Sequence, residues 1–127
     1  MNEGDQIPEF RVTPDKYLPH RYAGASGDFN PIHIDREFAT QVGLPRNILH
    51  GLYSMAQVAL ANAAAVGGDP RKLKRLSVQF RGMGVPETEM IVTGTVKEVR
   101  DGHAVVDTQA EQEGKSIIRN AEAELEL

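Results

Sequence analysis

The amino-acid sequence predicts a single α+β domain over residues 1–127, in which a curled antiparallel sheet of about five strands wraps around a long central apolar helix. The length suits one domain, and no Pro/Gly/Ser-rich linker interrupts the chain. The run 51–66 is rich in helix-forming residues and is apolar nearly all round. Downstream of it, strand-length runs alternate with turn signals.

At the N-terminus we expect a short strand followed by a broken helix. Apolar residues recur over 7–12, where a first strand can form. Thr13 and Pro14 are typical of an N-cap followed by proline at the first helical position, so a helix is expected to begin there. Pro19 would remove a backbone donor within that helix, and it is therefore expected to kink or break it.

The middle of the chain predicts two further helices. Asp35 is a suitable N-cap for a helix over 36–42, and Gly43 suits the left-handed position that closes it. After a connecting loop, the long helix runs from Gly51 to Val66 and ends at a pair of glycines. A helix that is apolar on nearly every side requires a covering layer.

The C-terminal half supplies that layer as a run of strands. The expected strands are 73–83, 88–100, 103–112 and 115–127. Asp101-Gly102 and Glu113-Gly114 are hairpin signatures, so the last three strands are expected to form an antiparallel meander. A sheet of this kind curled around one helix is the hot dog architecture.

Charge and composition exclude several classes of function. A net charge of −4 gives no basic footprint for a phosphate backbone, so we expect no nucleic-acid partner. The chain has no cysteine, and hence no disulfide framework or thiolate nucleophile. The N-terminus lacks a signal-peptide pattern and the long helix is too short to cross a bilayer, so we expect a cytoplasmic protein without membrane insertion. A core of this size would gain from a second copy, which makes a dimer the expectation.

Three polar residues within one short segment suggest proton-transfer chemistry. Asp28, Asn30 and His33 lie within six residues, and Pro31 holds the residue before it in an extended conformation. The segment can therefore form a defined bend that directs a carboxylate and an imidazole to one pocket. Such a pair suits the reversible addition of water to a double bond conjugated with a thioester carbonyl, because one group takes a proton from water and one delivers a proton to the α-carbon.

The same reaction needs stabilisation of the charge that develops on the thioester oxygen. A free N–H at the start of a helix supplies a donor together with the positive end of the helix dipole. Gly51 opens the long helix and has no side chain that would keep an oxygen away from its amide. We therefore expect the Gly51 backbone to form an oxyanion hole.

The run from Tyr22 to Asp35, YAGASGDFNPIHID, followed by the run His50 to Ser54, HGLYS, resembles the MaoC-like (R)-specific enoyl-CoA hydratase and 3-hydroxyacyl-thioester dehydratase family. The resemblance implies a homodimeric hot dog fold, or a heterodimer as in some members, acting on thioesters of CoA or of acyl carrier protein. It implies catalytic roles for Asp28 and His33, with Asn30 orienting them. It also places the Gly51 amide in the oxyanion hole and Ser54 beside the site, and it implies no cofactor and no metal.

Basic residues provide candidate contacts for the substrate handle. Arg71, Lys72, Lys74 and Arg75 form one local cluster, which is either a solvated turn or an attachment point for CoA phosphates or an acidic carrier protein. The segment 79–86 loosely resembles the family strand that presents the thioester arm, and within it Arg81 is a further candidate.

Structural roles remain open for each candidate. Asp28 and Asn30 could make only an Asx turn, and His33 could cap a helix or pack. Gly51 could serve close helix–sheet packing, and His50 could be either a second acid/base or a packed residue. The four histidines, with no cysteine, have no recognisable zinc spacing.

Two other functions compete with hydration. A hot dog thioesterase often places a carboxylate on the central helix, but residues 51–66 contain no acidic side chain. A non-catalytic acyl-thioester-binding subunit of a heterodimeric dehydratase is the second alternative, and the presence of both Asp28 and His33 disfavours it.

Overall fold

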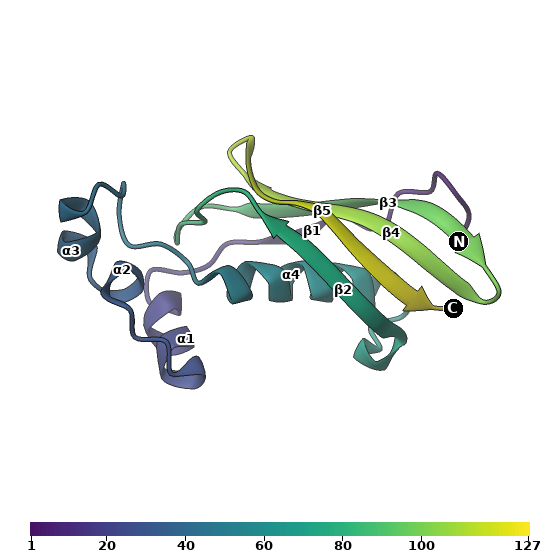
Figure 1. The fold of residues 1–127 in the computed structure, drawn as a ribbon, viewed down its shortest axis with the longest axis horizontal. Helices are drawn as coiled ribbons and strands as arrows, with labels where there is room; N and C mark the ends of the chain where they lie inside the picture. The colour runs from purple at the N-terminus through teal and green to yellow at the C-terminus, as the bar shows by residue number, and fades with distance from the viewer.

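A computed structural model describes all residues, 1–127, and has one sheet laid along one long helix (Figure 1). The strands are β1 (Phe10–Val12), β2 (Leu73–Phe80), β3 (Met90–Arg100), β4 (His103–Gln112) and β5 (Lys115–Glu126). The helices are α1 (Leu18–Ser26), α2 (Pro31–Ile34), α3 (Arg36–Gln41), α4 (Gly51–Ala64) and the short 3₁₀ helix η1 (Pro70–Lys72). The predicted α+β hot dog fold, with its sheet of about five strands, is confirmed.

The sheet is antiparallel throughout, with the order β1-β3-β4-β5-β2. The last three strands in the chain form the predicted meander. Its two hairpins turn at Asp101-Gly102 and Glu113-Gly114, where all four residues have positive φ angles between 51° and 76°. This is the backbone that a type I′ turn requires, so the dipeptides do set both turns.

The core lies between α4 and the concave face of the sheet. Val58 and Ala61 of α4 are fully buried, as are inward-facing residues of β3, β4 and β5 such as Val92, Val106 and Ile118. Alternate residues of β3 and β4 are buried, which is the period expected of strands covered on one face.

One face of α4 stays uncovered, contrary to the expectation that the sheet wraps the helix on all sides. Every fourth residue from Leu52 to Ala64 is exposed, and the two leucines of this row, Leu52 and Leu60, keep 64% and 52% of their surface. The row comprises Leu52, Ala56, Leu60 and Ala64. A single curved sheet covers only one side of a helix, so this apolar row remains at the surface of one chain.

The predicted helix start at Thr13-Pro14 is wrong. Pro14 is buried and its carbonyl accepts the N–H of Glu87, so this segment packs against the loop between β2 and β3. The helix begins instead at Leu18, with Pro19 in its first turn. Proline is tolerated there because the first helical N–H groups have no intrahelical partner.

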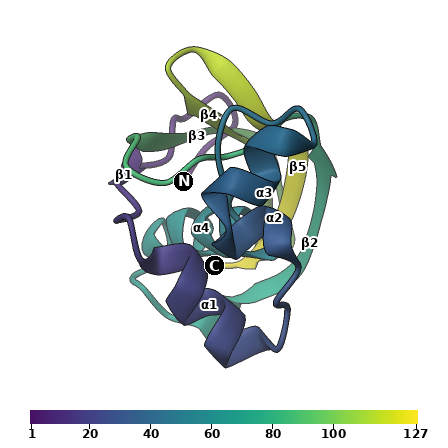
Figure 2. The ribbon, with the colours of Figure 1, turned by 90° about the vertical axis from the view of Figure 1, so that its left-hand side faces the viewer.

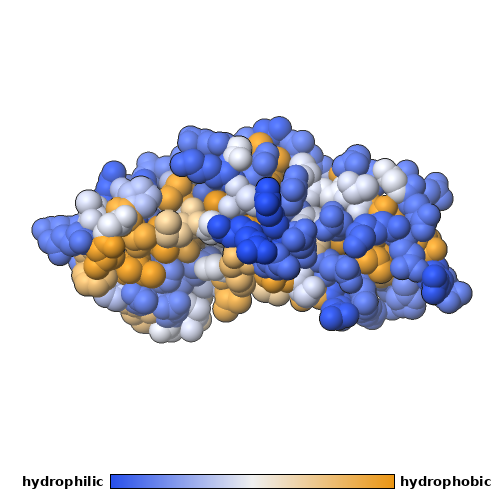
Figure 3. Space-filling view, turned by 45° about the horizontal axis from the view of Figure 1, so that its top comes forward, coloured by the Kyte–Doolittle hydropathy of each residue, from blue (hydrophilic) through white to orange (hydrophobic).

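The three short helices gather at one end of the molecule, beside the start of α4 (Figures 1 and 2). In the space-filling view, apolar surface collects at that end, whereas the middle of the visible face is largely hydrophilic (Figure 3). Exposed apolar side chains of the short-helix segments are Phe29, Phe38 and Val42. None of the helices combines the length and apolar character needed to cross a bilayer.

Candidate active site

Two local hydrogen bonds from backbone amides to side chains hold the segment from Asp28 to His33 in place. Asp28 Oδ1 accepts the Asn30 N–H at 3.2 Å, and Asn30 Oδ1 accepts the Ile32 N–H at 3.2 Å. The second bond makes Asn30 the N-cap of α2, whose third residue is His33. Asn30 therefore positions the aspartate on one side and the histidine on the other. The sequence suggested a loop here, but residues 31–34 form a helical turn.

His33 is buried, and the segment preceding α4 holds it and its neighbour Ile32 through three hydrogen bonds. Its Nδ1 lies 2.8 Å from the Ile48 carbonyl, which can only accept, so this nitrogen carries the hydrogen. The Ile48 N–H donates to Ile32 O, and Asn47 Nδ2 donates to His33 O. In the neutral ring, Nε2 is then a free lone pair. It lies 3.7 Å from Asp28 Oδ2, close enough for one water beside the pair to contact both atoms.

His50 packs against this pair. Its ring stacks on that of His33, with the ring centroids 3.9 Å apart and an angle of 20° between the planes. The ring of Tyr22 also packs against His50, with a distance of 4.6 Å between the ring centroids. His50 Nε2 donates to the Asp28 carbonyl, while its buried Nδ1 has no partner. Asp28, His33 and His50 approach within 4.8 Å, but nearly parallel stacked rings cannot both aim in-plane lone pairs at one ion. His50 is therefore placed to hold Asp28 and His33 in position.

The start of α4 presents unpaired amides. No hydrogen bond uses the N–H of Gly51 or Leu52, and no side chain caps the helix, whose N-cap residue is His50. Gly51 is exposed. These two donors and the helix dipole can therefore stabilise an anionic oxygen that approaches the helix start.

Two small hollows meet at Gly51. The first, of about 190 Å³, is lined by His33, Ser54 and Gly84 among others, and the second, of about 290 Å³, by Asp28 and His50 among others. The geometry thus brings together five residues singled out in the sequence: Asp28, Asn30, His33, Gly51 and Ser54.

The basic candidates fall in two places. Arg81 lines a groove of about 500 Å³ together with Arg46 and Lys115, and this groove shares Gly82, Met83 and Ile117 with the first hollow. Arg71 and Lys72 lie on η1, beyond the other end of α4. The 14 residues of that helix span about 20 Å, so these two side chains are not gathered with Asp28 and His33.

Two titrating side chains border α1. Hydrogen bonds from Arg21, with smaller help from the Tyr17 N–H, hold the pKa of Asp15 below its ordinary value. Burial, followed by the charge of Asp15, raises the pKa of Tyr53, so this phenol remains neutral at neutral pH. Tyr53 packs edge-on against Tyr22, which in turn contacts the ring of His50.

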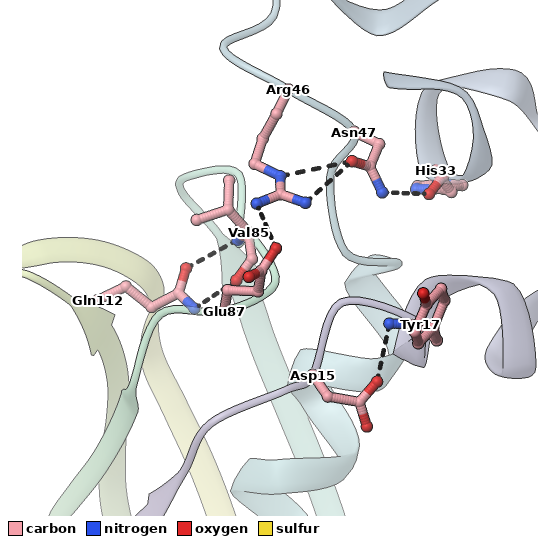
Figure 4. Close-up of polar contacts among 8 residues, drawn as sticks. All are labelled: Asp15, Tyr17, His33, Arg46, Asn47, Val85, Glu87 and Gln112. Carbon is pink, nitrogen blue, oxygen red and sulfur yellow. Dashed lines mark hydrogen bonds and ion pairs between the residues drawn. The ribbon is translucent and has the colours of Figure 1, made fainter. Parts of the chain in front are cut away.

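A polar relay behind His33 was not expected from the sequence. Asn47 Oδ1 lies 3.4 Å from two guanidinium nitrogens of Arg46, whose third nitrogen donates to Glu87 at 3.1 Å (Figure 4). Asn47 Nδ2 completes the relay by donating to His33 O at 3.0 Å. Residues 44–47 looked like a plain connecting loop, because the partner of Asn47 is a backbone carbonyl and leaves no trace in residue types.

Replacing Asn47 by alanine should lower the free energy of unfolding by about 1–3 kcal/mol, because the buried carbonyl of His33 loses its donor. Urea unfolding followed by circular dichroism measures this. Gln109→Ala is the control, since Gln109 is exposed and makes only a 3.4 Å contact with Thr93. Its effect should stay within about 0.5 kcal/mol. Equal stability of the two variants would contradict the relay.

Comparison with known proteins identifies the family of the chain. The family model described as "MaoC like domain" matches residues 3–116. Over 116 residues, 88% of the chain, the sequence is 32% identical to fatty acid synthase subunit beta of Saccharomyces cerevisiae. It is also 32% identical to the peroxisomal enoyl-CoA hydratase 2 of Arabidopsis thaliana over 113 residues, again 88% of the chain. The matched regions are only 6% and 35% of these two relatives.

Solved structures share the fold. A MaoC-like dehydratase superposes with a TM-score of 0.94 at 28% identity, covering 100% of this chain and 41% of that one. An (R)-hydratase from A. caviae involved in PHA biosynthesis gives a TM-score of 0.89 at 21% identity, covering 100% and 97%. The family match extends over the segments from Asp28 to His33 and from His50 to Ser54. This chain therefore belongs to the MaoC-like dehydratase family.

Proposed function

We propose that the chain catalyses the reversible (R)-specific hydration of trans-2-enoyl thioesters, which in reverse is the dehydration of (R)-3-hydroxyacyl thioesters. The observation that carries this proposal is the position of the His33 Nε2 lone pair, 3.7 Å from the Asp28 carboxylate and beside an unpaired helix-start amide at Gly51. A base, a water-holding acceptor and an oxyanion donor are the groups that this addition requires. The family membership and the likeness to named hydratases support the same reaction.

In the proposed reaction, a water held between Asp28 and His33 attacks the β-carbon of the enoyl group. Its oxygen forms the new C–O bond while His33 Nε2 takes one of its protons. Electron density moves through the double bond onto the thioester oxygen, which the Gly51 N–H stabilises. The proton on His33 then passes to the α-carbon, which restores the neutral imidazole and completes the addition of H and OH. Dehydration runs through the same steps in reverse.

We further propose that the groove of Arg46, Arg81 and Lys115 holds the arm that carries the thioester. The groove adjoins the first hollow and is lined by three cations and one carboxylate, Glu113. Arg46 is already paired with Glu87, so Arg81 and Lys115 are the cations available to the phosphate of CoA or of a carrier-protein prosthetic group. The guanidinium of Arg81 has no acidic partner, and its one hydrogen bond is to the neutral side chain of Gln79. It is therefore a better placed anchor than Arg71, which is paired with Asp69.

A spectrophotometric assay tests the function. Purified protein should remove the absorbance of the conjugated enoyl thioester of crotonyl-CoA or a longer trans-2-enoyl-CoA, and chiral analysis should find the (R)-3-hydroxy product. Release of free CoA with the double bond intact would point instead to a thioesterase. If the chain reacts with no enoyl thioester of any acyl length, whether of CoA or of carrier protein, catalysis by this chain is refuted and a binding subunit is favoured.

We also propose that two copies of the chain associate through the exposed row on α4. The row spans the whole helix and alternates two leucines with two alanines, so two helices could approach closely over the small residues. Contact with a partner chain would bury Leu52 and Leu60 and so remove the exposed apolar face of α4 from water.

On this basis, Leu60→Glu should convert a dimer of the 13.9 kDa chain into a monomer, because a charge would be placed in the apolar contact. Sedimentation velocity measures the change. Val42→Glu, at an exposed apolar position at the end of α3, should leave the dimer intact. A wild-type protein that sediments as a monomer at micromolar concentration would contradict the association.

A further inference from the structure

The side chain of Phe80 divides the candidate active site. The hollow that contains His33 and Ser54 and the hollow that contains Asp28 and His50 share only two residues, Gly51 and Phe80. Their volumes are about 190 and 290 Å³, at or below the lower end of the range of ligand pockets, roughly 300 Å³. The two proposed catalytic side chains, although 3.7 Å apart, therefore line different hollows.

The ring of Phe80 separates the two hollows by direct contact with Gly51. A Cβ atom placed on Gly51 would lie 3.2 Å from Cε1 and 3.5 Å from Cδ1 of Phe80, so the ring packs onto the helix start. An oxygen that approaches the Gly51 amide must therefore share this space with the ring. Glycine at this position is what allows the ring to come so close.

The ring of Phe80 lies at the surface, whereas its backbone is fixed in the sheet. Phe80 pairs with Ile118 in the sheet, and the next two amides, of Arg81 and Gly82, both donate to the Ile117 carbonyl. The side chain itself is 51% exposed at the end of β2. A side chain that is half in solvent changes rotamer on a picosecond-to-nanosecond timescale without disturbing the sheet.

Resting on the proposed hydratase function, we propose that Phe80 is the gate of the thioester site. In the closed state its ring covers Gly51 and separates the Asp28 hollow from the His33 hollow. When an acyl thioester binds, the ring swings away, the two hollows join, and both catalytic side chains face the same double bond. Phe80 thereby controls access of the thioester to the oxyanion donor and takes no part in proton transfer.

A tryptophan at the gate would report the motion directly. The chain contains no tryptophan, so Phe80→Trp introduces the only indole. Addition of butyryl-CoA, a saturated thioester that cannot be hydrated, should shift its emission to longer wavelength as the ring leaves Gly51 for solvent. Phe38→Trp, on α3 and outside both hollows, is the control and should not respond. Unchanged emission in Phe80→Trp, with calorimetry showing that butyryl-CoA is bound, would overturn the gate.

Kinetics give an independent test. If the open state is populated about 10% of the time, removing the ring should raise kcat/KM for enoyl-CoA on the order of tenfold. Phe80→Ala should show this gain and Phe80→Leu a smaller one, whereas the control Phe38→Ala should match the wild type. A kcat/KM that is unchanged or lower in Phe80→Ala would overturn the gate while leaving hydration by the wild type intact. A wild type that neither binds nor hydrates thioesters would overturn both the function and the gate.

Discussion

Asp28→Asn and His33→Asn should each lower kcat for enoyl-thioester hydration by a factor of about 10² to 10⁴, the range typical of losing a general acid or base. Asparagine at position 28 can still accept the Asn30 N–H, so the turn survives and only the charge is removed. Asparagine at position 33 can still donate to the Ile48 carbonyl, so the buried contact survives and only the Nε2 lone pair is lost. Each variant thus separates chemistry from architecture.

Two comparisons make this experiment decisive. His33→Ala should be equally inactive but less stable, because the Ile48 carbonyl is left without a donor in a buried setting. His103→Ala should behave like the wild type, since His103 is the exposed first residue of β4, where its ring hydrogen-bonds only to the Asp101 carbonyl. Full activity in both asparagine variants, measured by loss of enoyl absorbance, would refute the assignment of Asp28 and His33.

The outcome at residues 28–33 shows why local signals were readable in the sequence. The bonds from Asp28 to Asn30 and from Asn30 to Ile32 join residues two positions apart. Interactions of this length depend on residue type and order alone. The same holds for the hairpin at Asp101-Gly102, whose positive φ angles are a property of the dipeptide.

Local sequence patterns gave wrong or no predictions where contact with a distant segment determines the conformation. Thr13-Pro14 has the composition of a helix start, but Pro14 instead receives the Glu87 N–H from the loop before β3. Asn47 and Phe80 likewise had no local pattern, because their importance comes from the His33 carbonyl and from Gly51, which are far away in the sequence. The candidate site residues were therefore readable from two local segments, 28–33 and 50–54, whereas the residues that hold and cover them required the fold.

Gly82→Ala should be the most damaging substitution at a position without side-chain chemistry. A Cβ on Gly82 would lie well inside 3.0 Å of the Ser116 carbonyl oxygen, a distance that real Cβ atoms essentially never show. Ser116 belongs to β5 and is paired with Glu111 of β4, so the obstructing atom is backbone that cannot move aside cheaply. Overpacking of this kind costs about 1–3 kcal/mol, measurable by urea unfolding.

The clash at Gly82 should also lower activity, because it should displace residues of the candidate active site. Gly82 lines both the first hollow and the groove, and two residues later the Gly84 carbonyl accepts the Leu49 N–H just before α4 begins. A displaced loop would therefore shift the helix start at Gly51, and kcat/KM should fall together with stability. Gly24→Ala is the matched control: its Cβ would meet nothing within 4 Å, inside α1. Alanine is favoured over glycine in a helix by about 0.5–1 kcal/mol, so Gly24→Ala should stabilise the protein while Gly82→Ala destabilises it. Equal shifts in the two variants would show that the close approach of Gly82 to β5 does not constrain the site.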